Sequence, residues 1–73
     1  MNEDVMLRDQ WLEIRGKMKE WWNKLTDDDL NVIDGHRDRL IAKLRERYGY
    51  SKEQAAKELQ QHLAQFQRMP QTL

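Results

Sequence analysis

Apolar residues recur every three or four positions along most of this chain, and only three glycines and one proline interrupt the pattern. This spacing gathers apolar side chains on one side of a helix, whereas a half-buried strand alternates them every second residue. The interruptions are Gly16, Gly35, Gly49 and Pro70. We therefore expect an all-α fold whose helix ends can be read from these few breaks.

The first segment predicts one continuous helix over residues 7–23. At about 100° per residue, its apolar stripe fits within an arc of about 80°. The stripe consists of Leu7, Trp11, Ile14, Met18, Trp22 and Leu25. Asp4 and Asp9 are both candidate N-caps. Gly16 lies nearly opposite the stripe, and it indicates either a bend or close contact, or a tolerated surface position.

The clearest helix start in the chain is the sequence Thr-Asp-Asp-Asp at residues 26–29. Thr26 can cap the helix with its hydroxyl, and Asp29 can reach back to the Thr26 amide in a variant of the capping box. The three carboxylates also lie in the first turn, where the helix dipole favours them. A short helix follows, and Gly35 is expected to end it in the left-handed conformation.

Two further helices complete the prediction. The third covers residues 36–48, with Gly49 as its left-handed C-terminal residue. Ser51 caps the fourth helix, and Gln54 completes a second capping box. The fourth helix is expected to end near Arg68, since the proline that follows cannot continue it.

Four short helices joined by brief turns must fold back on one another. The 73 residues suffice for one domain. We expect a compact four-helix bundle in a single domain at residues 1–68, with a disordered tail at residues 69–73. Most of the core volume is assigned to four aromatic residues, Trp11, Trp22, Tyr48 and Phe66.

Composition excludes several classes of protein. The absence of cysteine excludes disulfide scaffolds and thiolate zinc sites. No apolar run approaches the roughly 20 residues of a membrane-spanning helix. The chain opens with Met-Asn-Glu-Asp, which is acidic where secretory signals are basic. We therefore expect a soluble, cytoplasmic protein without a membrane span.

Catalytic motifs are lacking. The only histidines are His36 and His62, and the only serine is the predicted cap Ser51. No nucleophile elbow, phosphate-binding glycine loop or pair of metal-binding histidines is present. His62 lies at the edge of an apolar helix face, where a packing role is favoured over a role as a base. We predict that the protein is not an enzyme and uses no cofactor.

The acidic cluster at residues 26–29 partly resembles the start of a calcium-binding loop. Asp27, Asp29 and Asn31 have the spacing of loop positions 1, 3 and 5, and Asp38 falls at position 12. Position 6 would be Val32, where the sharp turn of such a loop requires glycine. A solvated helix start is the better interpretation, and no metal site is predicted.

The formal net charge of zero conceals a strong segregation of charge. Residues 26–34 carry a charge of −4, and residues 35–50 carry +3. Within the basic segment, Arg39, Lys43 and Arg47 are four residues apart and form one stripe on a helix, which we call the basic stripe. Such a stripe can follow phosphates, so it is a candidate partner surface. Its few charges and the adjacent acidic segment argue against nucleic acid.

Trp21 is a second candidate for partner binding, because it lies at the flank of the first apolar stripe. It either anchors a partner or a second copy of the chain, or closes the edge of the core. Leu12 lies well outside that stripe. We expect a monomer, with weak self-association through Trp21 as the alternative.

Two groups of residues resemble the CsbD-like family of small bacterial stress proteins. The first group is Trp11, Gly16-Lys17-Met18-Lys19-Glu20, Trp22 and Lys24-Leu25-Thr26-Asp27-Asp28-Asp29-Leu30. The second group is Gly35, Arg37-Asp38, Leu40, Lys43, Glu46-Arg47-Tyr48-Gly49 and Gln54-Ala55. The resemblance implies a general stress role without an established reaction or cofactor. It also implies a SAM-like arrangement of two roughly orthogonal helical hairpins.

From these observations we expect a non-enzymatic stress-response protein. Its action is expected to be noncovalent, through an unidentified macromolecular partner or as an abundant hydrophilic protectant. The alternative is a nucleic-acid-binding or protein-adaptor module that uses the basic stripe or Trp21.

Overall fold

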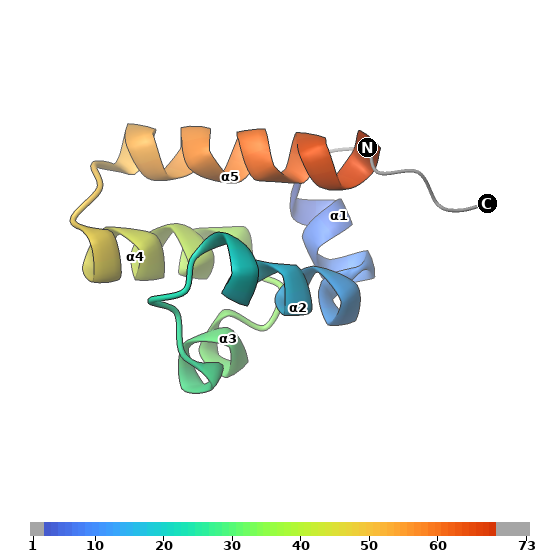
Figure 1. The fold of residues 1–73 in the computed structure, drawn as a ribbon, viewed down its shortest axis with the longest axis horizontal. Helices are drawn as coiled ribbons and strands as arrows, with labels where there is room; N and C mark the ends of the chain where they lie inside the picture. Colours follow the sequence, from blue (N-terminus) through green and yellow to red (C-terminus); the bar gives the residue numbers. More distant parts are fainter. Residues whose placement is uncertain (1–2, 69–73) are drawn as a thin grey trace.

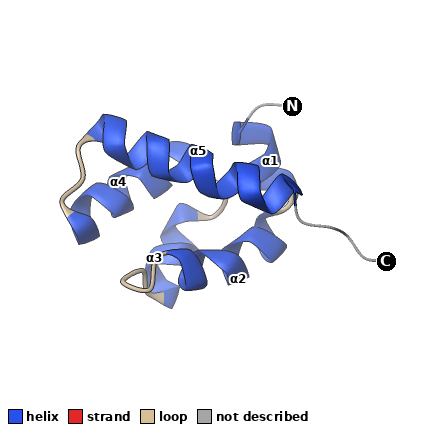
Figure 2. Cartoon of the chain, turned by 45° about the horizontal axis from the view of Figure 1, so that its top comes forward, coloured by secondary structure: helices blue, strands red, loops and turns tan. Residues whose placement is uncertain are grey.

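The structure is a computed structural model that describes residues 3–68 of the chain, and these residues form five helices (Figure 1). The helices are α1 (Glu3–Asp9), α2 (Trp11–Trp21), α3 (Asp27–Ile33), α4 (Arg37–Tyr48) and α5 (Lys52–Arg68). No strand is found in this part of the chain, which confirms the all-α prediction (Figure 2). The disordered tail predicted at residues 69–73 lies outside the described residues.

The prediction of one helix over residues 7–23 is wrong, because the segment begins at Glu3 and divides at Gln10. Gln10 leaves the helical conformation, with φ −114° and ψ 26°, and its side chain makes no capping hydrogen bond. The apolar stripe continues across the break, since Leu7 and Trp11 are both buried. The bundle therefore has five helices instead of four.

The break turns α1 out of line with α2 (Figure 1) and brings it against the start of α4. A close contact with Gly35 accompanies this turn. A Cβ atom on Gly35 would lie 3.3 Å from the Arg8 Cα atom, and the glycine has φ +81°. The close approach thus occurs at Gly35, whereas Gly16 has open space around it, with nothing within 4 Å of a Cβ position.

Most of the other predicted helix ends are confirmed. The Thr26 hydroxyl accepts from the Asp29 amide, and an Asp29 carboxylate oxygen accepts from the Thr26 amide, each at 3.1 Å. The Ser51 hydroxyl accepts from the Gln54 amide at 3.1 Å, so Ser51 caps α5 as predicted. The predicted second capping box is wrong, because the Gln54 side chain donates to the Glu58 carboxylate at 3.0 Å and does not return to Ser51. Gly49 ends α4 with φ 71°. Helix α3 ends at Ile33, and its C-cap Asp34 takes a left-handed conformation. Gly35 follows with φ 81°, so it takes the left-handed conformation predicted for it.

The core is formed by apolar side chains from all five helices. Its buried members are Met6, Leu7, Trp11, Ile14, Met18, Trp22, Leu25, Leu30, Ile33, Leu40, Ile41, Leu44, Ala55, Leu59 and Leu63. Of the four aromatic residues assigned to the core, Trp11 and Trp22 are buried, whereas Tyr48 and Phe66 are half-buried against its edge. The aromatic volume is therefore shared between the interior and the rim.

Helices α4 and α5 run side by side and make the most extensive helix–helix contact, while α3 packs against α4 (Figures 1 and 2). The short connection at residues 49–51 requires α5 to run back along α4. The proposed likeness to SAM-like hairpins stays a prediction. Between residues 3 and 68, no helix is both long and apolar enough to cross a membrane.

Candidate functional site

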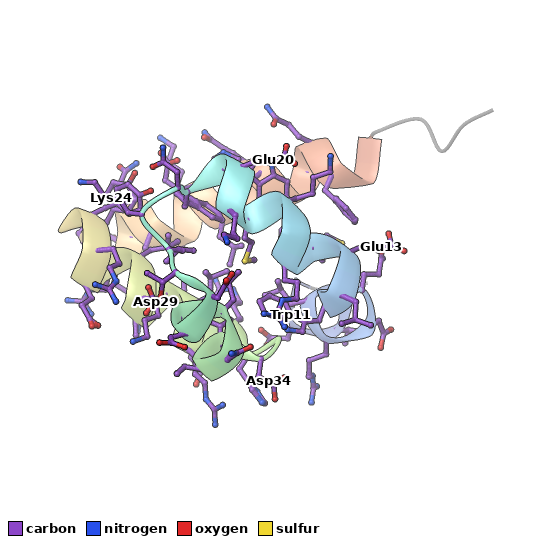
Figure 3. The ribbon with its side chains drawn as sticks, turned by 60° about the horizontal axis from the view of Figure 1, so that its bottom comes forward. Trp11, Glu13, Glu20, Lys24, Asp29 and Asp34 are labelled. Atoms are coloured by element: carbon purple, nitrogen blue, oxygen red, sulfur yellow. The ribbon has the colours of Figure 1, made fainter. Side chains whose placement is uncertain are left out.

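A buried carboxylate joins α3 to α4. Asp29 lies in the first turn of α3 and is only 3% exposed, on the side of the helix that faces α4 (Figure 3). The Arg47 guanidinium donates two hydrogen bonds to it, from Nε to Oδ2 at 2.8 Å and from Nη2 to Oδ1 at 3.0 Å. The Lys43 Nζ lies 3.4 Å from Oδ1. One carboxylate therefore engages two cations of the basic stripe.

These contacts strongly favour the ionised form of Asp29. The Arg47 hydrogen bonds are the main cause of a pKa far below the ordinary aspartate value, and the Thr26 amide and Lys43 act in the same direction. Burial raises the pKa of Asp29, but its effect is smaller than the combined effect of these contacts. The same pairing raises the pKa of Arg47. Asp29 thus caps α3 and also neutralises part of the positive charge on α4.

The basic stripe therefore has a structural role that the sequence analysis did not assign to it. Two of its members bind Asp29, and the third, Arg39, donates from Nη1 to the Val32 carbonyl oxygen at 3.1 Å. All three cations thus lie against α3. The sequence contains a signal for this pairing, because a segment with a charge of −4 directly precedes a segment with a charge of +3. Adjacent segments of opposite charge favour ion pairs between them. Its use as a partner surface stays a prediction.

A second polar seam joins α2 to α3. The Lys19 Nζ lies 2.8 Å from the Asp27 Oδ1, and the Arg15 Nη2 donates to the Asn31 Oδ1 at 3.1 Å. The Lys19 hydrogen bond is the main cause of a lowered pKa at Asp27. Two of the acidic residues considered for calcium, Asp27 and Asp29, thus bind cations of their own chain. Within residues 3–68, no group of three or more histidine and carboxylate side chains is placed to hold a metal ion.

Trp21 belongs to an aromatic cluster between α2 and α5. Its ring centroid lies 5.8 Å from that of Trp22, 5.1 Å from that of His62 and 6.4 Å from that of Phe66. The His62 ring is also 4.6 Å from the Trp22 ring, and its Nδ1 is 2.8 Å from the Glu58 carbonyl oxygen. The half-buried position of Trp21 fits the edge-closing interpretation, and His62 has the packing position expected of it.

A tyrosine pair at the end of α4 was not anticipated. The rings of Tyr48 and Tyr50 stack at a centroid distance of 5.3 Å. The Lys24 amide donates to the Tyr48 hydroxyl at 3.1 Å, and the Lys24 Nζ lies 5.1 Å from the same ring. Burial raises the pKa of Tyr50. The pair ties the α2–α3 loop to the α4–α5 turn, through a contact 24 residues apart that no local pattern signals.

A groove of about 480 Å³ lies between α4 and α5. Its lining combines apolar residues with charges of both signs and consists of Arg37, Asp38, Ile41, Ala42, Arg45, Lys52, Glu53 and Ala56. Neither the basic stripe nor Trp21 belongs to this lining. The predicted partner residues and the groove are therefore different parts of the surface.

The capped acidic helix start, the glycine that ends α4 and the paired basic stripe all fall within the segment that carries the family resemblance. A sequence model of the family described as CsbD-like matches residues 6–65. The chain belongs to the CsbD-like family. That match begins within α1 and ends within α5, so the buried Asp29 contacts lie inside the CsbD-like unit.

Relatives of this CsbD-like chain occur in several bacteria. The UPF0337 protein YjbJ of Salmonella typhimurium is 61% identical over 49 residues, which cover 67% of this chain and 70% of the relative. The UPF0337 protein YjbJ of Escherichia coli K12 is 57% identical over the same length, covering 67% and 71%. The UPF0337 protein ECA0631 of Pectobacterium atrosepticum is 54% identical over 59 residues, covering 81% and 84%.

Proposed function

We propose that this CsbD-like protein is a non-enzymatic stress-response protein of the cytoplasm that acts by noncovalent interaction through its folded surface. The observation that carries the proposal is the buried Asp29, which is held by Arg47 and Lys43. Such an arrangement depends on the position of each residue and fixes α3 against α4. A protectant that acted only through hydrophilic composition would not require it.

The nucleic-acid alternative is weaker for the same reason. Phosphate binding by the basic stripe would compete with Asp29 for Lys43 and Arg47, and the acidic start of α3 lies beside it. A protein that binds phosphates also loses affinity steeply as salt increases. Binding to DNA or RNA that is salt-dependent and lost in Arg39→Glu would favour this alternative.

A heat-aggregation assay with a client enzyme distinguishes action through the fold from action through composition. The test variant is Leu44→Asp, which places an unpaired carboxylate in the core at a fully buried position. Val32→Asp, at a side chain that is 50% exposed, makes the same chemical change on the surface. We expect protection to be retained in Val32→Asp and lost in Leu44→Asp. Equal protection by both variants would instead establish the hydrophilic-protectant function.

A further inference from the structure

The outer face of α4 is exposed at its centre. Helix α4 lies between α5 and α3 (Figure 1), and its buried side chains, Leu40, Ile41 and Leu44, point toward the core. Ala42 lies on the opposite side of the helix and is exposed. Because alanine has a small side chain, another helix can approach the backbone of α4 closely at this position.

Four charged residues surround Ala42 on this face, and their signs alternate. They stand three or four residues before and after it, and all are exposed: Asp38, Arg39, Arg45 and Glu46. Side chains at these spacings are neighbours on a helix surface. Asp38 and Arg45 are seven residues apart, about two turns, and therefore share one flank of the face. Arg39 and Glu46 have the same separation and share the other flank.

The two flanks differ in how far their charges are engaged within the chain. The side chains of Asp38 and Arg45 make no hydrogen bond or ion pair among residues 3–68. Arg39 uses one guanidinium nitrogen for a backbone carbonyl of α3. The Glu46 carboxylate lies 3.6 Å from the Lys43 Nζ. The first flank therefore carries one cation and one carboxylate that lack partners, too far apart along the helix to pair with each other.

The next charged groups around this face do not upset the balance. At the start of α5, Lys52 and Glu53 line the adjoining groove and carry opposite charges. Arg37, which lines the same groove, is engaged within the chain, and Lys43 is turned toward Asp29. The remaining charges of the surface are three cations and three carboxylates, so two copies of it do not repel one another.

This face is complementary to itself. When two α4 helices cross antiparallel at Ala42, Asp38 of each copy faces Arg45 of the second copy. On the other flank, Arg39 faces Glu46 of the second copy. The alternation of charge also permits a parallel pair, in which Asp38 faces Arg39 and Arg45 faces Glu46. The antiparallel pair is favoured, because it joins the two side chains that have no partner in their own chain.

We propose that two copies of the protein associate through the outer faces of α4, antiparallel and centred on Ala42, with Asp38 of each copy paired to Arg45 of the other. The same patch is used on both copies, so the interface closes as a twofold dimer. Because the contact is small and its charges are exposed, the dimer is weak and dissociates further as the salt concentration rises.

Sedimentation of the full chain over about a hundredfold range of concentration, up to the millimolar range, tests the association by mass action. We expect the average mass of the wild type to rise from monomer toward dimer. Asp38→Arg and Arg45→Asp each place like charges together at both ends of the contact, so each should remain monomeric with unchanged helical circular dichroism. Glu13→Arg makes the same change of charge as Asp38→Arg on α2, at an exposed position, and should associate like the wild type.

Two further variants test the geometry itself. The double variant Asp38→Arg/Arg45→Asp keeps the net charge of the wild type and exchanges the members of each pair, so it should dimerise again. Ala42→Gln enlarges the side chain at the crossing point without changing charge or helix propensity much, and it should weaken the dimer.

A wild type that stays monomeric at every concentration would overturn the proposal. Loss of association in Glu13→Arg would also overturn it, since net charge would then explain the single variants. A folded double variant that stays monomeric, or Ala42→Gln that dimerises as strongly as the wild type, would contradict the antiparallel contact at Ala42.

Discussion

Asp29 performs two tasks with one side chain, and this residue shows best how local and tertiary structure are joined here. As the third residue of α3, it completes the capping box with Thr26. Both carboxylate oxygens accept from Arg47 on α4, and one of them, Oδ2, also accepts from the Thr26 amide. The capping role was predictable from four consecutive residues. The tertiary role was not, because it depends on which side of α4 faces α3.

Replacing Asp29 by asparagine tests how much this carboxylate contributes to the stability of the fold. Hydrogen bonds to charged groups contribute about 1.5–3 kcal/mol, and Arg47, whose side chain is 41% exposed, can turn to water when its partner is lost. We therefore expect Asp29→Asn to lower the free energy of unfolding in urea by about 2 kcal/mol.

Asp28→Asn is the matched control for this change. Asp28 is exposed and precedes Asp29 in the same helical turn, so its loss should cost at most about 1 kcal/mol, through the helix dipole. Equal effects of the two substitutions would show that Asp29 acts only as a first-turn charge.

At the scale of the helices, prediction succeeded where polar side chains and glycines mark the ends and failed where none does. The caps at Thr26 and Ser51 and the left-handed Gly49 bound the predicted helices correctly. The break at Gln10 has no cap hydrogen bond and leaves the apolar stripe uninterrupted. It is understood only from the packing of α1 against Gly35, a contact that lies beyond the reach of local sequence.

Gly16 and Gly49 allow a test of backbone conformation inside a helix and at a helix end. A Cβ atom added at Gly16 or at Gly49 meets nothing within 4 Å, so packing contributes to neither change. Gly16 is inside α2, where alanine is favoured by about 1 kcal/mol. Gly49 has φ +71°, where alanine costs about 1–2 kcal/mol.

Gly16→Ala should therefore raise the thermal midpoint of unfolding and Gly49→Ala should lower it, as followed by circular dichroism at 222 nm. Each glycine serves as the control for the other. A lowered midpoint in Gly16→Ala would mean that α2 does not continue as a regular helix through this position.

At the scale of the whole molecule, the all-α class follows from the apolar period, but the placement of the charges does not. The segregation of −4 in residues 26–34 from +3 in residues 35–50 is visible in the sequence. Only the structure shows that the two segments meet across the α3–α4 contact through Asp29. The groove between α4 and α5 could not be predicted either, because it depends on how the flanks of two helices meet.

This pairing makes the stability of the whole fold dependent on pH. The pKa of Asp29 is lower in the folded state than in the unfolded chain, where it is about 3.9. The unfolded state therefore binds more protons in acid. The stabilisation is present in full above about pH 5, and it decreases as the pH falls below the unfolded pKa toward the folded one.

The central claim is that a buried, ionised Asp29 holds α3 against the basic stripe of α4, and its carboxyl carbon resonance in an NMR titration tests this most directly. We expect that resonance to stay at its ionised position as the pH is lowered through 4, the range in which an ordinary aspartate in a model peptide titrates. A midpoint for Asp29 near the ordinary value of about 3.9, with the protein still folded, would contradict the claim.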